Sequence, residues 1–207
     1  MLAVFTPDRI RRLTLALLGA AVCVSSAPIA AAPRITITVR VYQTAGLPSA
    51  VQEKALAETE ALLQSALVDV RWRKCTGPAN ERYATCDALP GPSELTLRIL
   101  GEKALSQGTP GALGDAVVIR CAGGVLATVY YDQVEWMANE AGAEIAVLLG
   151  RVAAHELGHL LMRTASHTPR GLMRPNWTLT EIRLNRTVDW MFTGRDADAM
   201  RQPGEAD

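Results

Sequence analysis

Short apolar stretches recur along the chain, and each predicts a β-strand. Residues 35–42 alternate strictly between branched apolar side chains and polar ones, which is the pattern of a strand with one buried face. Comparable stretches predict further strands at residues 68–73, 95–99, 115–121 and 125–131. Residues 101–114 are rich in glycine and are predicted to form a surface loop. Residues 122–124 suggest a tight hairpin between the last two strands.

Two segments instead have the apolar spacing of helices. Pro48 opens the first, whose apolar residues recur on one face as far as Leu67. The second is predicted as one long helix from near Asn139 to Met162, followed by a turn at residues 165–177. One or two short helices complete the chain, and residues 193–196 resemble a capping box. This order predicts an α/β (α+β) fold, in which a twisted mixed sheet of about five strands packs on a backing helix and the long helix.

The first 32 residues have the features of a secretory signal peptide. Three arginines precede an apolar run at residues 13–24, and small residues follow as far as Ala32. The run is too short to span a membrane, although a retained anchor is the alternative. Export would therefore remove residues 1–32 and leave residues 33–207 as a single domain, secreted or periplasmic. No membrane contact is predicted beyond this segment.

Composition excludes several classes of protein. The formal net charge is zero and only 5% of residues are aromatic, which argues against a nucleic-acid partner. Hydrophobic residues make up 49% of the chain and charged residues 20%, which is typical of a globular protein and excludes a disordered one. Nothing in the sequence fixes an oligomeric state.

Export permits a disulfide bond. Cys75 and Cys86 bracket a loop that contains proline and glycine, so they form the favoured pair. Cys121 would then be a buried free thiol, and the other pairings stay open.

Candidate metal-binding and catalytic residues lie on the predicted long helix. All three histidines of the chain fall within 13 residues, and two of them belong to the sequence His-Glu-Leu-Gly-His at 155–159. On a helix this spacing puts His155 and His159 on one face, where both can bind a single Zn²⁺ ion. Glu156 lies about 100° round the helix. It can act as general base towards a water whose pKa the zinc lowers.

The alternative for this segment is a buried helix that carries two histidines by chance. That alternative gives no reason to bury Glu156, because a buried carboxylate without a partner is costly. Gly158 lowers helix propensity, and we expect it where the helix packs closely against a strand.

A catalytic zinc normally takes three protein ligands, so a third is expected beyond the helix. His167 lies eight residues after His159, past a polar stretch where the helix should end, and it can fold back under the metal. An exposed turn histidine is the alternative role for it. Glu181, on a predicted short helix, is the rival third ligand. We favour His167 because its turn is short and ends at Gly171-Leu172-Met173.

The segment HELGHLLMRTASHTPRGLMRPNW resembles the active-site region of the metzincins, a clan of secreted zinc endopeptidases with matrixin-like members. It also resembles the site helix of small bacterial secreted proteins. The resemblance implies a zincin-like fold. It also implies that His155, His159 and His167 bind zinc and that Glu156 is the general base.

The same resemblance assigns the residues after the third histidine. Met173 would form the Met-turn, which packs beneath the metal without binding it. Pro175 and Trp177 would line the pocket for the residue that follows the cleaved bond. The chain departs from the metzincin pattern by two additional residues between the second and third histidines. The helix is therefore expected to run on, and the turn to be rebuilt.

These residues together predict a secreted or periplasmic zinc endopeptidase that uses zinc-activated water. Its protein or peptide substrate is expected to add, as an extended strand, to the edge strand at 115–121. Two alternatives stay open: a non-catalytic, zinc-stabilised binding module, and a zinc hydrolase that acts on a non-peptide amide. Glu156 favours an enzyme over the module, because zinc binding alone does not require it.

Overall fold

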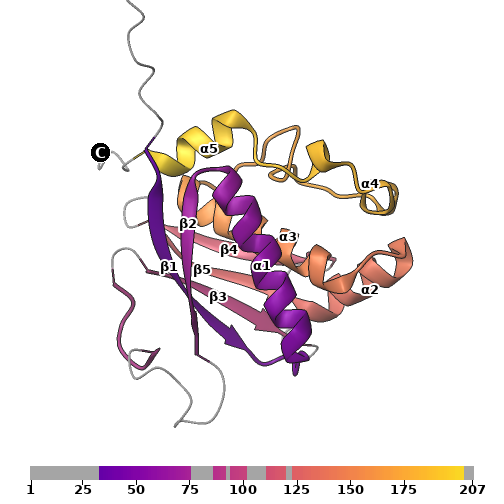
Figure 1. The fold of residues 1–207 in the computed structure, drawn as a ribbon, viewed down its shortest axis with the longest axis horizontal. Helices are drawn as coiled ribbons and strands as arrows, with labels where there is room; N and C mark the ends of the chain where they lie inside the picture. Colours follow the sequence, from indigo (N-terminus) through magenta and orange to yellow (C-terminus); the bar gives the residue numbers. More distant parts are fainter. Residues whose placement is uncertain (1–32, 76–85, 92–93, 102–110, 120–122, 203–207) are drawn as a thin grey trace, which may run out of the picture. The chain divides into compact units, whose positions relative to one another are not determined.

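The computed structural model describes residues 33–75, 86–91, 94–101, 111–119 and 123–202. The predicted signal peptide, Cys121 and the first residue of the predicted hairpin turn lie outside these ranges. Within them, strands and helices follow the predicted order with one additional helix (Figure 1).

The strands of the described residues form one five-stranded sheet in the order β2-β1-β3-β5-β4. Their bounds are β1 Ile35–Gln43, β2 Val68–Lys74, β3 Glu94–Leu100, β4 Gly114–Ile119 and β5 Gly123–Tyr130. The first three and β5 run parallel, whereas β4 pairs antiparallel with β5 at one edge. This mixed sheet confirms the predicted fold class, and β4 is an edge strand as expected. Predicted residues 120 and 121 of this strand are outside the described part.

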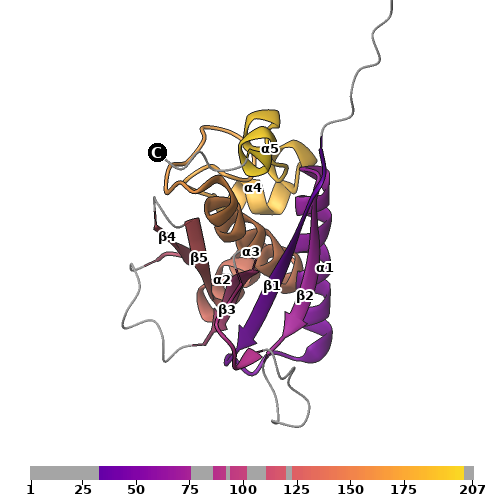
Figure 2. The ribbon, with the colours of Figure 1, turned by 90° about the vertical axis from the view of Figure 1, so that its left-hand side faces the viewer.

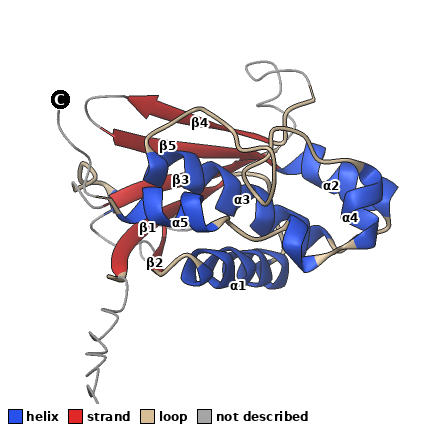
Figure 3. Cartoon of the chain, turned by 90° about the horizontal axis from the view of Figure 1, so that it is seen from above, coloured by secondary structure: helices blue, strands red, loops and turns tan. Residues whose placement is uncertain are grey.

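One face of the sheet is apolar and carries the two longest helices. Ile37, Val39 and Val41 of β1 are buried, because they alternate with the polar residues of that strand. Helix α1 (Ser49–Ser65) packs beside β2, and helix α3 (Ile145–Met162) packs across β5 and β4 (Figures 2 and 3). Both helices therefore cover the apolar side, as the predicted backing and active-site helices should.

The backbones of α1 and α3 approach closely at a glycine. A Cβ atom on Gly150 would lie 2.6 Å from the carbonyl oxygen of Ala55. The Thr59 hydroxyl donates to that oxygen, over 2.8 Å, and lies 3.0 Å from the oxygen of Gly150. Helix α3 is long and apolar enough to cross a membrane, but 78% of it is buried inside the fold, which is typical of a core helix.

The prediction of one long helix from Asn139 to Met162 was wrong. The structure has two helices, α2 (Tyr131–Ala141) and α3, separated by residues 142–144. Gly142 has a φ of 64° and donates its N–H to the last carbonyls of α2, which ends that helix. The sequence did carry a signal for α2, because its buried residues Val134, Ala138 and Ala141 have helical spacing.

Three short elements follow the predicted turn: α4 (Leu179–Leu184), the 3₁₀ helix η3 (Thr187–Asp189) and α5 (Gly194–Arg201). Helix α5 packs against α3, so the C-terminal segment returns to the helix that carries two of the histidines. Thr193 and Asp196 form the predicted capping box, with the Thr193 hydroxyl accepting from the Asp196 N–H.

A disulfide joins Cys75 and Cys86, which confirms the favoured pairing. The Tyr42 hydroxyl of β1 donates to the Cys86 carbonyl over 2.9 Å. The Arg40 guanidinium, on the same face of β1, donates to the Ala88 and Leu89 carbonyls. These bonds fix the chain after the disulfide against the polar face of the sheet, away from α3.

Candidate metal centre

The structure brings the three histidines together. His155 and His159 lie one turn apart on α3 and are buried, and His167 comes from the turn after α3 and is exposed. One ring nitrogen from each can be chosen so that all lie within 4.8 Å of one another. Among the described residues, these three histidines are the group of His, Cys, Asp or Glu side chains that could hold a metal ion.

Backbone carbonyls orient the two helical histidines. Nδ1 of His155 donates to the Leu172 oxygen and Nδ1 of His159 to the Thr164 oxygen, each over 2.8 Å. A carbonyl oxygen can only accept a hydrogen bond, so each ring carries its proton on Nδ1. The unprotonated Nε2 of each ring then has a free lone pair. This is the tautomer in which imidazole binds a metal through Nε2.

The two free nitrogens face each other. Nε2 of His155 lies 3.1 Å from Nε2 of His159. In a tetrahedral zinc site with Zn–N bonds of 2.0–2.1 Å, two ligand nitrogens lie about 3.3 Å from each other. Burial lowers the pKa of His155 to about 3 and also lowers that of His159, so neither ring supplies a proton to bridge them. A cation bound between the rings would remove the repulsion between the two Nε2 lone pairs. Imidazole nitrogens are ligands that zinc prefers, so the donor set fits this metal.

The turn that carries His167 starts where α3 ends. Arg163, with a φ of 54°, closes the helix, so α3 continues one turn past His159 as expected. The Thr168 N–H then donates to the Met173 oxygen over 2.9 Å, which closes the turn just after His167. Although His167 is exposed, partial desolvation of its ring lowers its pKa as well, which favours the neutral form.

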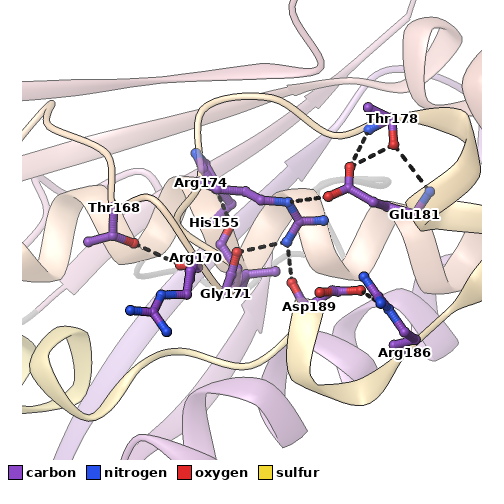
Figure 4. Close-up of polar contacts among 10 residues, drawn as sticks. His155, Thr168, Arg170, Gly171, Arg174, Thr178, Glu181, Arg186 and Asp189 are labelled. Carbon is purple, nitrogen blue, oxygen red and sulfur yellow. Dashed lines mark hydrogen bonds and ion pairs between the residues drawn. The ribbon is translucent and has the colours of Figure 1, made fainter.

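Glu181 is occupied elsewhere. Its carboxylate accepts from the Thr178 N–H (2.8 Å) and hydroxyl (2.7 Å) in the capping box of α4. It also forms an ion pair with Arg174 at 3.3 Å (Figure 4). The carboxylate therefore caps a helix and balances an arginine, and it is not part of the histidine cluster.

Glu156 is buried beside the start of the edge strand. A Cβ atom on Gly114 would lie 2.8 Å from Cγ and from Oε1 of Glu156, so only glycine leaves room for this side chain. Burial, and to a lesser extent the nearby charge of Asp115, raise the pKa of Glu156 to about 8. The prediction of a surface loop at residues 101–114 was therefore wrong at its end, because Gly114 begins β4 and packs on the candidate base.

A cavity of about 480 Å³ opens at this place. It is lined by Gly111, Ala112, Leu113, Gly114, Met137, Val152, His155, Glu156, His167, Arg174, Pro175, Asn176 and Trp177. The Trp177 ring stands perpendicular to that of His155, with centroids 5.6 Å apart. Pro175 and Trp177 thus border the same cleft as His155 and His167. Residues 111–113 and Met137 were missed, because their places depend on the edge strand and on the unpredicted helix α2.

Met173 lies directly beneath α3. Its side chain is fully buried, and a Cβ atom on Gly158 would lie 2.7 Å from its Sδ and 3.0 Å from Cε1 of Phe192. Gly158 stands between His155 and His159, so Met173 packs under the histidine pair. The expectation that Gly158 packs on a strand was wrong: the close approach is to the turn after the third histidine.

Gly158→Ala is expected to destabilise the protein by about 1–3 kcal/mol, the usual cost of overpacking. In an open helix the same change would stabilise by about 1 kcal/mol. Here the added methyl group would meet the buried side chains of Met173 and Phe192, at 2.7 Å from Sδ and 3.0 Å from Cε1. Urea denaturation would measure the change. Gly194→Ala in α5 is the matched control, because no atom of the described residues lies within 4 Å of its added Cβ. A Gly158→Ala protein as stable as the wild type would contradict this packing.

No protein-family model matches the chain, and no curated protein matches it. Among solved structures, the chain is similar to an archaemetzincin from Methanopyrus kandleri, with a TM-score of 0.45 and 18% sequence identity. The similarity covers 81% of this chain and 94% of the archaemetzincin. The candidate metal centre rests on the geometry of this chain alone.

Proposed function

We propose that this chain is a zinc-dependent endopeptidase of metzincin type. His155, His159 and His167 would bind the zinc, and Glu156 would be the general base. The observation that carries the proposal is the pair of facing Nε2 atoms of His155 and His159, 3.1 Å apart, with His155 lining the same cavity as the buried Glu156. A purely structural zinc site would explain the three histidines. It would not explain why Glu156 is buried, because burying a carboxylate costs free energy and such a site has no use for a base.

In this donor set, zinc would act as a Lewis acid on a substrate carbonyl and lower the pKa of a nearby water. Glu156 would take a proton from that water on its carboxylate and deliver it to the leaving amine. The walls of the cavity would exclude bulk water from this transfer. Leu172 and Thr164, through their carbonyls, would keep both helical histidines in the correct tautomer.

The edge strand offers a place for an extended peptide. In the sheet formed by the described residues, β4 pairs with β5 on one side only, and it begins at Gly114 beside Glu156. A substrate strand would add to its other side and pass the histidines. Trp177 and Met137 supply apolar surface to the cavity, which favours an apolar side chain next to the cleaved bond. Export through residues 1–32 is part of the proposal, and N-terminal sequencing of the exported protein would check it.

A broad peptide library would test the proposal. We expect the purified protein to cleave internal peptide bonds, to stop when a chelator removes zinc, and to resume when zinc is restored. The library also separates the endopeptidase from the two alternatives. A protein that holds zinc firmly but cleaves no peptide would contradict an endopeptidase and leave the binding module and the hydrolase of a non-peptide amide.

Trp177→Ala is expected to change which residue is accepted after the cleaved bond while zinc content stays the same. The Trp177 ring borders the cavity but offers no ligand atom to the metal, so its removal enlarges the pocket. Sequencing of library products would show a shift towards bulkier side chains at that position. An unchanged cleavage profile would place Trp177 outside the substrate pocket.

A further inference from the structure

Arg174, directly after Met173, contacts several segments around the candidate metal centre. Only 7% of its surface is exposed, and it lines the same cavity as His155 and His167. Its Nη1 donates to the Gly171 oxygen over 2.8 Å and to the Asp189 oxygen. Its Nε pairs with the Glu181 carboxylate at 3.3 Å. Figure 4 shows one guanidinium that links the turn, α4 and the segment after α4.

The backbone that Arg174 holds is the one that orients the metal ligands. Gly171 is adjacent to Leu172, whose oxygen accepts from His155 Nδ1. The Met173 oxygen accepts from the N–H of Thr168, the residue after His167. A shift of the 171–173 backbone would therefore turn the His155 ring and displace His167 together.

A second path runs from Arg174 to the site through aromatic rings. Its guanidinium lies 4.8 Å from the centroid of Trp190, and the Arg151 guanidinium lies 4.3 Å from the same centroid. Trp190 packs edge to face on Trp177 at 5.1 Å, and Trp177 packs on His155 at 5.6 Å. The Arg174 side chain thus reaches His155 through both backbone and aromatic contacts.

The charge of Arg174 requires an explanation, because a buried cation close to a metal site opposes the binding of a second cation. Glu181 balances that charge. This explains why a carboxylate stands near the centre without joining the histidines. A planar guanidinium can serve two carbonyls and a carboxylate at once, which a lysine ammonium cannot do in this geometry.

We propose that Arg174 is a positioning residue for the metal centre: its guanidinium fixes the 171–173 backbone so that His155 and His167 meet His159 at one point. The inference rests on the proposed zinc site. It does not require that the protein cleave peptides.

Arg174→Ala and Arg174→Lys test it in the full-length protein. We measure zinc affinity by chelator competition, the visible spectrum of the cobalt-substituted protein, and the melting temperature without metal. Both variants are expected to bind zinc at least ~10-fold more weakly, the low end for residues that orient ligands. Both should alter the cobalt spectrum, because the His155 ring is no longer held. Lysine should not rescue the site, since it cannot replace the planar fork.

Arg186→Ala is the matched control. Arg186 is an exposed arginine of the same segment and pairs with the Asp189 carboxylate at 2.8 Å, so only an exposed ion pair is lost. We expect its zinc affinity and cobalt spectrum to equal those of the wild type.

Wild-type zinc affinity and spectrum in either folded Arg174 variant would overturn the proposal, even with a lower melting temperature. Failure of both variants to fold would overturn it too, because Arg174 would then serve the fold and not the site. The zinc and cobalt readouts do not involve turnover. A wild-type protein that binds zinc but cleaves no peptide would refute the endopeptidase and leave this inference standing.

Discussion

Glu156→Gln is expected to lose at least ~100-fold of peptidase activity, the low end of general-base contributions. Glutamine keeps the shape of the side chain in the space that Gly114 leaves, and it can still form hydrogen bonds. It cannot accept a proton from water at neutral pH. The fold and the zinc site should stay intact, because Glu156 does not belong to the histidine cluster.

The measurement is the kcat of both proteins on one library-derived peptide, together with their zinc content. Glu140→Gln is a matched control, because Glu140 is an exposed glutamate on α2. Undiminished turnover in Glu156→Gln would remove the proposed base. Loss of zinc from this variant would assign Glu156 to metal binding instead.

Zinc removal is expected to lower the melting temperature of the wild type by roughly 10 °C. A metal present at a thousand times its Kd stabilises the folded state by about 4 kcal/mol. In a protein of this size each kcal/mol corresponds to about 2–4 °C. His159→Ala should lose this response, because one of the two facing Nε2 atoms is gone.

Thermal melts with and without chelator would measure the effect in both proteins. In wild type the chelator should shift the melting curve, and in His159→Ala the two curves should coincide. An equal shift in both would mean that the metal binds away from the histidines.

The sequence was sufficient to predict the parts of the fold that depend on local patterns. Residues 35–42 alternate, and the strand lies there. The four-residue spacing of His155 and His159 placed both on one face of a helix. Cys75 and Cys86 were paired because they bracket a short loop. Each of these predictions uses neighbours in the sequence, where periodicity and chain reach decide the outcome.

The predictions that failed depend on contacts between distant segments or on a single glycine. Gly142 ends α2, but it lies within a stretch of helical apolar spacing, so the sequence pattern does not show that the helix breaks there. Gly158 meets Met173, which only the path of the turn determines. Arg174 gave no signal in the sequence, because its partners Gly171, Glu181 and Asp189 come together only when the C-terminal segment folds back.

The proposed function depends on a zinc ion held by three histidines. Metal analysis of the purified wild type, His167→Ala and Glu181→Gln tests it most directly, with zinc affinity measured in each. We expect one zinc per chain in the wild type and in Glu181→Gln, with a smaller loss of affinity in Glu181→Gln, where Arg174 loses its counter-charge, than in His167→Ala, where a ligand is lost. Full affinity in His167→Ala together with loss of zinc from Glu181→Gln would contradict it, because the third ligand would then be the glutamate.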